Sequence, residues 1–329
     1  MLNQLTALMA EQGWDLLLFY GNTWRKDFFR YLINENYSTP WAMASLDRDG
    51  HVGRAFLPAA GFSVGSVVAI AGLELMEARQ VEALGITPVS ATAQIEEMRR
   101  VKSPGEIDCI RRAAQLADQG YEYFAKTIEP GMAEYELVAE VEGFLKSNGA
   151  EDNFMLIASG GTEVTGMKPP TERRFRVGDQ VTTELTPQIG GYYAQICRTL
   201  ILGEPNTDQR RAFEIFFEAE QAAEALLAPG VDIADVARVQ NDVFRKYGYG
   251  EYTGSKYTRV RGHNLGLHAD ETPYVLEDVH YTVKEGMVII AHPNTYLPLS
   301  GYMVFGDTLL VTAHGCVPLN RMERKLFQR

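Results

Sequence analysis

The sequence predicts an α+β protein of two domains, in which the second domain is a duplication. The basic run RRVK is followed by SPGE, whose Ser, Pro and Glu form a strong helix start and mark a boundary. Farther on, the Pro-Gly pairs at 130–131 and 229–230 each separate a long helical segment from an amphipathic one. We therefore expect a small α/β domain at residues 1–97 and a larger, duplicated domain at residues 98–329.

The first domain has the pattern of one helix followed by several short strands. Apolar residues at helical spacing predict a helix from Leu2 to Gln12 that stops at Gly13. The strands are expected at Asp15–Tyr20, Ala42–Leu46, Val52–Leu57 and Ser66–Ala71, with a hairpin turn at 47–50.

The second domain repeats one order of elements. Its helices are expected at Ser103–Lys126, Glu134–Ser147, Thr207–Leu227 and Asp232–Lys246, and each pair is followed by β-rich segments. Pro-Gly before an amphipathic helix is also common punctuation, but four successive features match in order, which favours a pseudo-twofold domain. A ligand site is expected between its two halves.

Composition limits the class of protein and its partners. With 329 residues, of which 46% are apolar and 22% charged, the chain can bury a full core as an ordinary soluble globular protein. A net charge of −12, spread along the chain, argues against a nucleic-acid partner. Three cysteines without CxxC spacing indicate a reducing, cytoplasmic compartment. The apolar run near the N-terminus is too short for a signal peptide or a membrane span.

One hairpin carries polar residues in an apolar frame. Glu184 lies before the turn at 190–193 and Gln195 lies after it, so pairing of the two strands brings both side chains to one face. The alternative is that Glu184 lies on the exposed face of an edge strand. Arg198, in the second strand, is expected to be a structural ion partner.

Two histidines occur in β-rich surroundings. His263 lies in the glycine-flanked loop at 262–266, which allows backbone to approach a ligand, although such histidines are also common turn residues. His292 interrupts the apolar run Met287–Ala291 just before Pro293. A buried imidazole there needs a partner, and the alternative is a satisfied core histidine.

Glu184, His263 and His292 together suit two kinds of chemistry. Two imidazoles and one carboxylate can hold one iron or zinc ion with open positions. The same groups suit a metal-free acid–base site, in which a neutral imidazole accepts a proton. Residue types alone leave both interpretations open.

Five segments carry a resemblance to a known family: VKSPGEIDCIRRA, RRFRVGDQV, GGYYAQICRTLILG, RGHNLGLHADETP and EGMVIIAHPNTY. Residues 98–329 resemble the pita-bread catalytic domain shared by methionine aminopeptidase, aminopeptidase P, prolidase and creatinase. Residues 1–97 resemble a shortened N-terminal domain of prolidases and creatinases. The resemblance implies the pita-bread fold with pseudo-twofold halves, and a homodimer like the two-domain creatinases.

The resemblance also shows where this chain departs from the family. The family's metallopeptidases hold two metal ions with two Asp, one His and two Glu. By position these fall here on Glu184, Gln195, His263, His292 and Gly306. The family's two other site histidines fall on Met167 and Asp270. Losing three carboxylates removes most of the charge that neutralises two ions, so we predict that a dinuclear peptidase is improbable.

Creatinase is the family member that cleaves a C–N bond without metal, and GGYYAQICRTL resembles its hairpin. Our main prediction is therefore a non-peptidase hydrolase that cleaves a C–N bond in a small polar metabolite, independent of metal and without cofactor. Its catalytic residues are predicted to be Glu184, His263 and His292. Its substrate-binding residues are predicted to be Lys168, Tyr193, Gln195, His268, Asp270 and Asp307.

Three alternatives remain open at the level of sequence. The first is a mononuclear metalloenzyme that holds iron or zinc with Glu184, His263 and His292. The second is a non-catalytic binding protein, and the third is a peptidase of the Xaa-Pro type. The expected partners are a small-molecule substrate and a second copy of the chain, with neither nucleic acid nor membrane.

Overall fold

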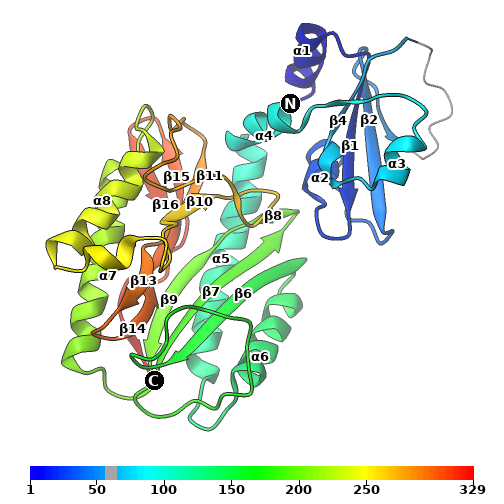
Figure 1. Ribbon diagram of the computed structural model, residues 1–329. Coiled ribbons are helices and arrows are strands. Elements are labelled where there is room, and N and C mark those ends of the chain that lie inside the picture. Colours follow the sequence, from blue (N-terminus) through cyan, green and yellow to red (C-terminus); the bar gives the residue numbers. More distant parts are fainter. Residues whose placement is uncertain (56–64) are drawn as a thin grey trace. The chain divides into compact units, whose positions relative to one another are not determined.

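The computed structural model describes residues 1–55 and 65–329 and divides the chain into two compact units, Met1–Arg100 and Val101–Arg329 (Figure 1). The end of the strand predicted at Val52–Leu57 lies outside the described residues. Across both described stretches, no helix combines the length and the apolar character needed to cross a membrane.

The first unit is a five-stranded mixed sheet with short helices. Its strands are β1 (Leu16–Asn22), β2 (Trp41–Asp47), β3 (Val52–Ala55), β4 (Val68–Ala71) and β5 (Val89–Ser90), in the order β3-β2-β1-β4-β5. Its helices are α1 (Leu2–Gln12), α2 (Asp27–Leu32), η1 (Leu73–Leu75), α3 (Ala78–Glu82) and α4 (Thr92–Arg100). Helix α1 ends as predicted at Gly13, whose φ of 71° lies in the left-handed region that favours glycine.

A buried ion pair ties α2 to α4 within this unit. Asp27 accepts hydrogen bonds from Arg99 Nη1 at 2.6 Å and from Arg25 Nε at 2.9 Å. Although burial opposes ionisation, the two guanidinium groups hold the pKa of Asp27 well below its usual range. The sequence pattern did not predict α2, because its six residues are too few to show a helical period.

The second unit combines four long helices with a large curled sheet. Its helices are α5 (Pro104–Thr127), α6 (Glu134–Ser147), α7 (Thr207–Leu226), α8 (Ile233–Lys246) and the short η2 (Gly250–Thr253). The four long ones begin and end within one residue of the predicted positions.

The strands of the second unit form a ten-stranded sheet and a two-stranded ribbon. They are β6 (Asp152–Gly160), β7 (Gln180–Ile189), β8 (Tyr192–Tyr193), β9 (Ile196–Ile201), β10 (Gly262–Asn264), β11 (Glu271–Tyr274), β12 (Val288–Ala291), β13 (Asn294–Leu297), β14 (Gly301–Val304), β15 (Gly306–Thr312), β16 (Gly315–Pro318) and β17 (Phe327–Gln328). The main path runs β11-β10-β12-β15-β9-β7-β6, and β13 pairs with β14. The β7–β9 hairpin therefore lies next to strand β15 of the second half.

Local sequence explains why the helices start where they do. At the start of α5, Glu106 reaches back so that its Oε2 accepts from the Ser103 backbone N–H at 2.8 Å and from its hydroxyl at 2.6 Å. Helix α7 has a matching box between Asn206 and Gln209. Asp232 caps α8 by accepting from the backbone N–H of Ala234.

The two helix pairs cover two halves of the sheet. Helices α5 and α6 pack on β6, β7 and β9 around Tyr121, Leu185 and Ile196. Helices α7 and α8 pack on β12 and β15 around Ile289 and Leu309, and also on the β13–β14 ribbon. In Figure 1, α7 and α8 accordingly lie beside the strands of the second half, and α6 beside those of the first. Glu184 lies on β7 and His263 on β10, and His292 directly follows β12.

A buried charge network joins β9 and β15 to the C-terminal segment. Arg198 is fully buried, and its Nη2 donates to Asp307 Oδ1 at 2.7 Å, so the predicted structural role of Arg198 fits its contacts. Arg324 donates to the other oxygen of Asp307 at 2.8 Å and approaches Glu220 Oε1 within 3.7 Å. Within the described chain, both carboxyl oxygens of Glu220 lack a hydrogen-bond partner. Burial raises the pKa of Glu220 to about 8.

We expect Glu220→Gln to stabilise the protein at alkaline pH and to have little effect near pH 5. The pKa of Glu220 is raised from 4.5 to about 8. Its stabilising contribution is therefore complete below about pH 4.5 and is lost as the pH rises through about 8. Glutamine mimics the neutral acid, so the variant should gain up to about 5 kcal/mol at pH 9 relative to the natural chain, since each pKa unit corresponds to about 1.4 kcal/mol.

The measurement is urea unfolding at pH 5, 7 and 9 for the natural protein and for Glu220→Gln. Glu218→Gln is the matched control on the same helix, since Glu218 is partly exposed and pairs with Lys246. An equal difference between the natural protein and Glu220→Gln at all three pH values would show that Glu220 is ionised throughout.

Candidate functional site

The β7–β9 hairpin presents Glu184 and Gln195 on one face. The register pairs Glu184 with Cys197, and Gln195 precedes Cys197 by two residues on the same side. Gln195 Nε2 contacts Cys197 Sγ at 3.4 Å. Glu184 and Gln195 are both buried, so Glu184 does not lie on an exposed face.

The two histidines meet at the end of the neighbouring strands β10 and β12. His263 pairs with Ile290 in the sheet, and His292 directly follows β12. The ring centroids lie 5.3 Å apart in an edge-to-face arrangement. Gly262 allows the backbone of β10 to lie close to β12, because a Cβ at that position would lie 2.1 Å from the Ile290 carbonyl oxygen.

The hydrogen bonds of His263 assign its tautomer. Nδ1 lies 3.0 Å from the carbonyl oxygen of Asn264 and 3.5 Å from Asp270 Oδ1, and both of these atoms are acceptors. Nδ1 therefore carries the proton, and Nε2 keeps its lone pair. Burial lowers the pKa of His263, which keeps the imidazole neutral near pH 7.

His292 is also neutral, but it is less well satisfied. Burial, reinforced by the neighbouring His263, lowers the pKa of His292 to about 3. Only 4% of the residue is exposed, and its Nδ1 has no hydrogen-bond partner in the part of the chain that the structure describes. A buried nitrogen without a partner is costly, so it points to a missing ligand or water molecule.

The carboxyl group of Glu184 has a pKa near neutral pH. Burial, and then the nearby carboxylate of Asp270, raise the pKa of Glu184 to about 7. Asp270 is itself half-exposed. The polar cluster of Glu184, Gln195, His263, His292 and Asp270 thus combines two neutral imidazoles with two carboxyl groups.

A buried lysine holds the loop that carries Asp270. Lys102 Nζ donates to Glu271 Oε2 at 3.1 Å, and both side chains are buried. With its amide oriented to satisfy both ends, Asn264 accepts from Lys102 Nζ at 2.8 Å and donates to the Val288 carbonyl oxygen at 2.7 Å. Glu271 Oε1 accepts from the His268 backbone N–H. Sequence reasoning missed this group, because nothing in the chain links Lys102 to a segment so distant in sequence.

The remaining predicted site residues have other surroundings. Asp307 stands apart from the polar cluster, because Arg198 and Arg324 hold both of its carboxylate oxygens. The Tyr193 hydroxyl donates to Asp152. Lys168 is exposed, and its backbone pairs with Ile157 on β6. His268 contacts the backbone of Asp270 through Nδ1.

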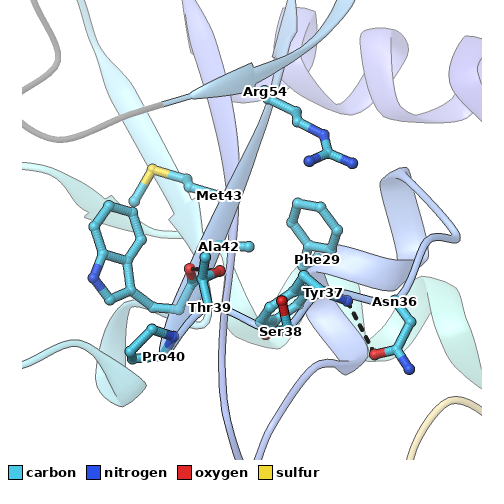
Figure 2. Close-up of a pocket in the computed structure, with 10 residues that line it drawn as sticks. Phe29, Asn36, Tyr37, Ser38, Thr39, Pro40, Ala42, Met43 and Arg54 are labelled. Carbon is cyan, nitrogen blue, oxygen red and sulfur yellow. Dashed lines mark hydrogen bonds between the residues drawn. The ribbon is translucent and has the colours of Figure 1, made fainter.

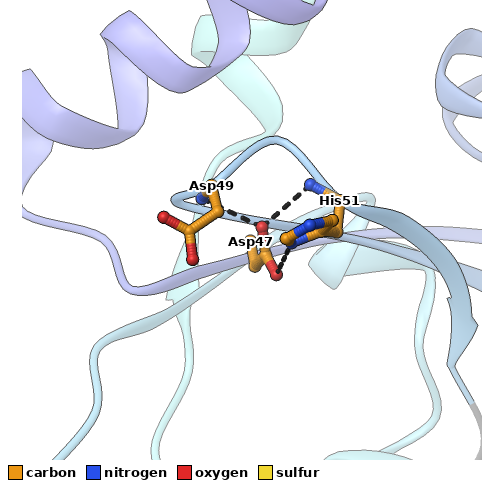
Figure 3. A group of neighbouring side chains, drawn as sticks. All are labelled: Asp47, Asp49 and His51. Atoms are coloured by element: carbon orange, nitrogen blue, oxygen red, sulfur yellow. Dashed lines mark hydrogen bonds and ion pairs between the residues drawn. The ribbon is translucent and has the colours of Figure 1, made fainter.

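Two features of the first unit look like sites but do not involve the polar cluster. Asp47, Asp49 and His51 bring three donor atoms within 4.8 Å of one another (Figure 3). This is an exposed hairpin turn, in which Asp47 Oδ1 accepts from the backbone N–H groups of Asp49 and His51. A pocket of about 740 Å³ is lined by Phe29, Tyr37, Trp41 and Arg54 among others (Figure 2), and no predicted site residue lines it.

Comparison with known proteins identifies a family and several relatives. Residues 108–313 match the profile of metallopeptidase family M24. The Xaa-Pro dipeptidase of Pyrococcus furiosus is 32% identical over 235 residues, which cover 71% of this chain and 66% of that protein. The alignment thus spans just under two thirds of that relative's length.

Solved structures agree over nearly the whole chain. Prolidase from Pyrococcus furiosus superposes with a TM-score of 0.82 at 25% identity, covering 97% of this chain and 99% of that one. The Xaa-Pro dipeptidase from Bacillus anthracis superposes with a TM-score of 0.85 at 22% identity, covering 100% and 99%, and supports the fold alone. Together these matches confirm the predicted pita-bread fold with its small preceding domain, and the resemblance on which that prediction was based.

Two predictions are wrong. A non-peptidase enzyme that hydrolyses a C–N bond without metal is contradicted, because the relatives are named Xaa-Pro dipeptidase and prolidase. The absence of a cofactor is contradicted, because the matching family is one of metallopeptidases. Both errors have the same cause. The prediction gave more weight to the creatinase-like hairpin and to the substitutions at Gln195, His292 and Gly306 than to the likeness of the whole unit to its family.

The residues of the polar cluster do not fit a pair of metal ions. Glu184 is the one carboxyl group buried in this cluster, and Gln195 brings a neutral amide. Gly306 brings no side chain at all. Over the two described stretches, His, Cys, Asp and Glu donors converge in a group of three only at Asp47, Asp49 and His51. We therefore derive no chemical step through a two-ion centre.

Proposed function

Because the chain belongs to metallopeptidase family M24, we propose that it is a hydrolase of short peptides of the Xaa-Pro type. The observation that carries the proposal is the 32% identity with an Xaa-Pro dipeptidase over 235 residues, 71% of this chain. The predicted cytoplasmic location and homodimer remain predictions.

The charges of the polar cluster suit a short peptide with a free amino end. Glu184 and Asp270 place two carboxyl groups near each other, and Asp270 is half-exposed. An α-ammonium group is the cationic end of a dipeptide, and a carboxylate at the rim of the cluster attracts it. His263, held by Asn264 and Asp270, presents Nε2 with a free lone pair in a fixed orientation. We assign Asp270 to the binding of the amino end and His263 to the reacting end.

The test is hydrolysis of Ala-Pro, Leu-Pro and Met-Pro, with Ala-Ala and Leu-Ala as comparison substrates, by protein supplied with Mn²⁺, Co²⁺ or Zn²⁺. We expect release of proline from the Xaa-Pro dipeptides and little cleavage of the others. N-acetylated Ala-Pro should be cleaved poorly by the natural protein. If none of the Xaa-Pro substrates is cleaved under any of these conditions, the proposal is wrong.

Asp270→Asn tests the binding of the amino end, because it removes the negative charge while its amide oxygen can still accept from His263 Nδ1. Asp270→Asn should raise KM for Ala-Pro about tenfold, which corresponds to roughly 1.4 kcal/mol, and should leave the poor cleavage of N-acetylated Ala-Pro unchanged. Asp278→Asn is the matched control, because Asp278 is exposed and pairs with Arg259. An unchanged KM for Ala-Pro in Asp270→Asn would remove Asp270 from substrate binding.

A further inference from the structure

The first unit contains a pocket that the proposed function leaves unused. Its volume of about 740 Å³ lies within the range of sites that hold small organic molecules. Phe29 of α2, Met43 of β2 and Arg54 of β3 line it together with the segment 36–42 (Figure 2). A ligand in this pocket is therefore recognised by residues of the first unit.

Aromatic rings line the pocket, and contacts with other residues of the unit hold them in place. The Phe29 and Tyr37 rings meet edge to face, with their centroids 5.0 Å apart. The Tyr37 hydroxyl donates to the Asn22 carbonyl oxygen at 2.9 Å. The Trp41 ring stacks on the Tyr20 ring at a centroid distance of 6.4 Å. Rings held in this way lose little freedom when a ligand binds, so the pocket is preformed for a flat apolar group.

Arg54 is the one charged side chain among the described residues that line the pocket. In Figure 2, its guanidinium group reaches toward the Phe29 ring. Arg54 pairs with Glu35, which does not line the pocket, and the two side chains are 54% and 58% exposed. An ion pair this exposed contributes little, so a ligand carboxylate can replace Glu35. Beside aromatic rings that carboxylate is shielded from water, which strengthens a two-pronged contact with arginine.

We propose that this pocket binds a small aromatic carboxylate, with the ring against Phe29, Tyr37 and Trp41 and the carboxylate on Arg54. A cationic ligand is repelled by Arg54 and finds no carboxylate among the described lining residues. The same chemistry occurs in a free aromatic acid and in the C-terminal aromatic residue of a peptide. The described lining shares no residue with the polar cluster, so the proposal does not depend on the proposed function.

The experiment is calorimetric titration of the full chain with phenylacetate, indole-3-acetate and N-acetylphenylalanine, the last as a model of a peptide end. We expect each acid to saturate at one equivalent per chain. Phenylacetamide, which lacks the charge, and acetate, which lacks the ring, should bind at least about tenfold more weakly than phenylacetate. Tighter binding of the two free acids than of N-acetylphenylalanine identifies a free acid as the ligand, and the reverse order identifies a peptide end.

Three variants locate the binding site. Arg54→Met should weaken the binding of phenylacetate by about tenfold or more. Glu35→Gln should strengthen it, because it removes the carboxylate that competes for Arg54. Arg79→Met is the matched control and should bind as the natural chain does. Arg79 is likewise exposed and paired with a glutamate, but it lines the neighbouring pocket on the other side of Trp41.

The proposal is overturned if none of the three acids binds at millimolar concentration, or if phenylacetamide binds as tightly as phenylacetate. Undiminished binding in Arg54→Met, or weakened binding in Arg79→Met, would also overturn it. Circular dichroism and thermal unfolding of each variant show whether a loss of binding reflects a loss of fold. If Arg54→Met does not fold, Glu35→Gln decides the matter, and binding no tighter than that of the natural chain would refute the role of Arg54.

Discussion

Lys102→Met is expected to lower the free energy of unfolding by about 3–5 kcal/mol. Lys102 and Glu271 form an ion pair in which the side chains are 1% and 9% exposed. Removing the ammonium group leaves the Glu271 carboxylate buried without its counter-charge, which costs far more than the pair contributes. The oxygen of Asn264 also loses its donor. The variant should therefore unfold at lower urea concentration than the natural chain.

A double variant shows whether the cost comes from the buried charge. Lys102→Met combined with Glu271→Gln removes both charges and keeps similar volumes, so it should recover most of the lost stability. The loop that Glu271 holds carries Asp270, so the single variant should also raise KM for Ala-Pro more than the double variant does. A cost below about 1 kcal/mol for Lys102→Met, or no recovery in the double variant, would contradict this account.

His263→Ala is expected to reduce kcat/KM for Xaa-Pro dipeptides by at least about 100-fold. The Nδ1 atom of His263 contacts two partners, Asn264 and Asp270, and these contacts fix the orientation of its free Nε2 atom. Alanine removes a neutral imidazole, with its electron-pair donor Nε2, from a buried site. A water molecule cannot take the place of this nitrogen in the same geometry. Circular dichroism should show that the fold persists, because alanine keeps the backbone pairing of His263 with Ile290.

His268→Ala is the matched control for this prediction. His268 belongs to the same loop, but its Nδ1 contacts only the backbone of Asp270 among the described residues, and the side chain is partly exposed. Steady-state kinetics on Ala-Pro should show a loss in His268→Ala at least tenfold smaller than in His263→Ala, roughly 1.4 kcal/mol less. Comparable turnover in His263→Ala and the natural protein would mean that catalysis does not use this cluster and would favour a non-catalytic role for it.

The sequence predicted the helices of the second unit well because local signals determine them. The Ser103–Glu106 capping box and the Asp232 cap are contained within four residues, and the apolar period of each helix is long enough to count. Helix α2 escaped prediction because its six residues are too few to show a helical period, and its buried contact joins Asp27 to Arg99, which is far away in sequence. Local pattern cannot report such a contact.

The same distinction separates the parts of the candidate site. Glu184 and Gln195 could be placed on one face because a single hairpin sets their register. The orphaned nitrogen of His292 and the clamp between Lys102 and Glu271 depend on how distant strands pack, and residue type reveals neither. Function was misjudged for a related reason. Individual substitutions at the site were read as a change of chemistry, whereas the likeness of the whole second unit indicates a peptidase family.

Gly306 has a consequence for attempts to redesign this enzyme. Its neighbour across the sheet end, the Ala291 carbonyl oxygen, occupies the space that a Cβ would need. Introducing glutamate there by itself should give misfolded protein instead of an added ligand. Laboratory evolution toward the family's usual metal content would first have to relax the segment around Ala291 and His292, and only then could a carboxylate at 306 be selected.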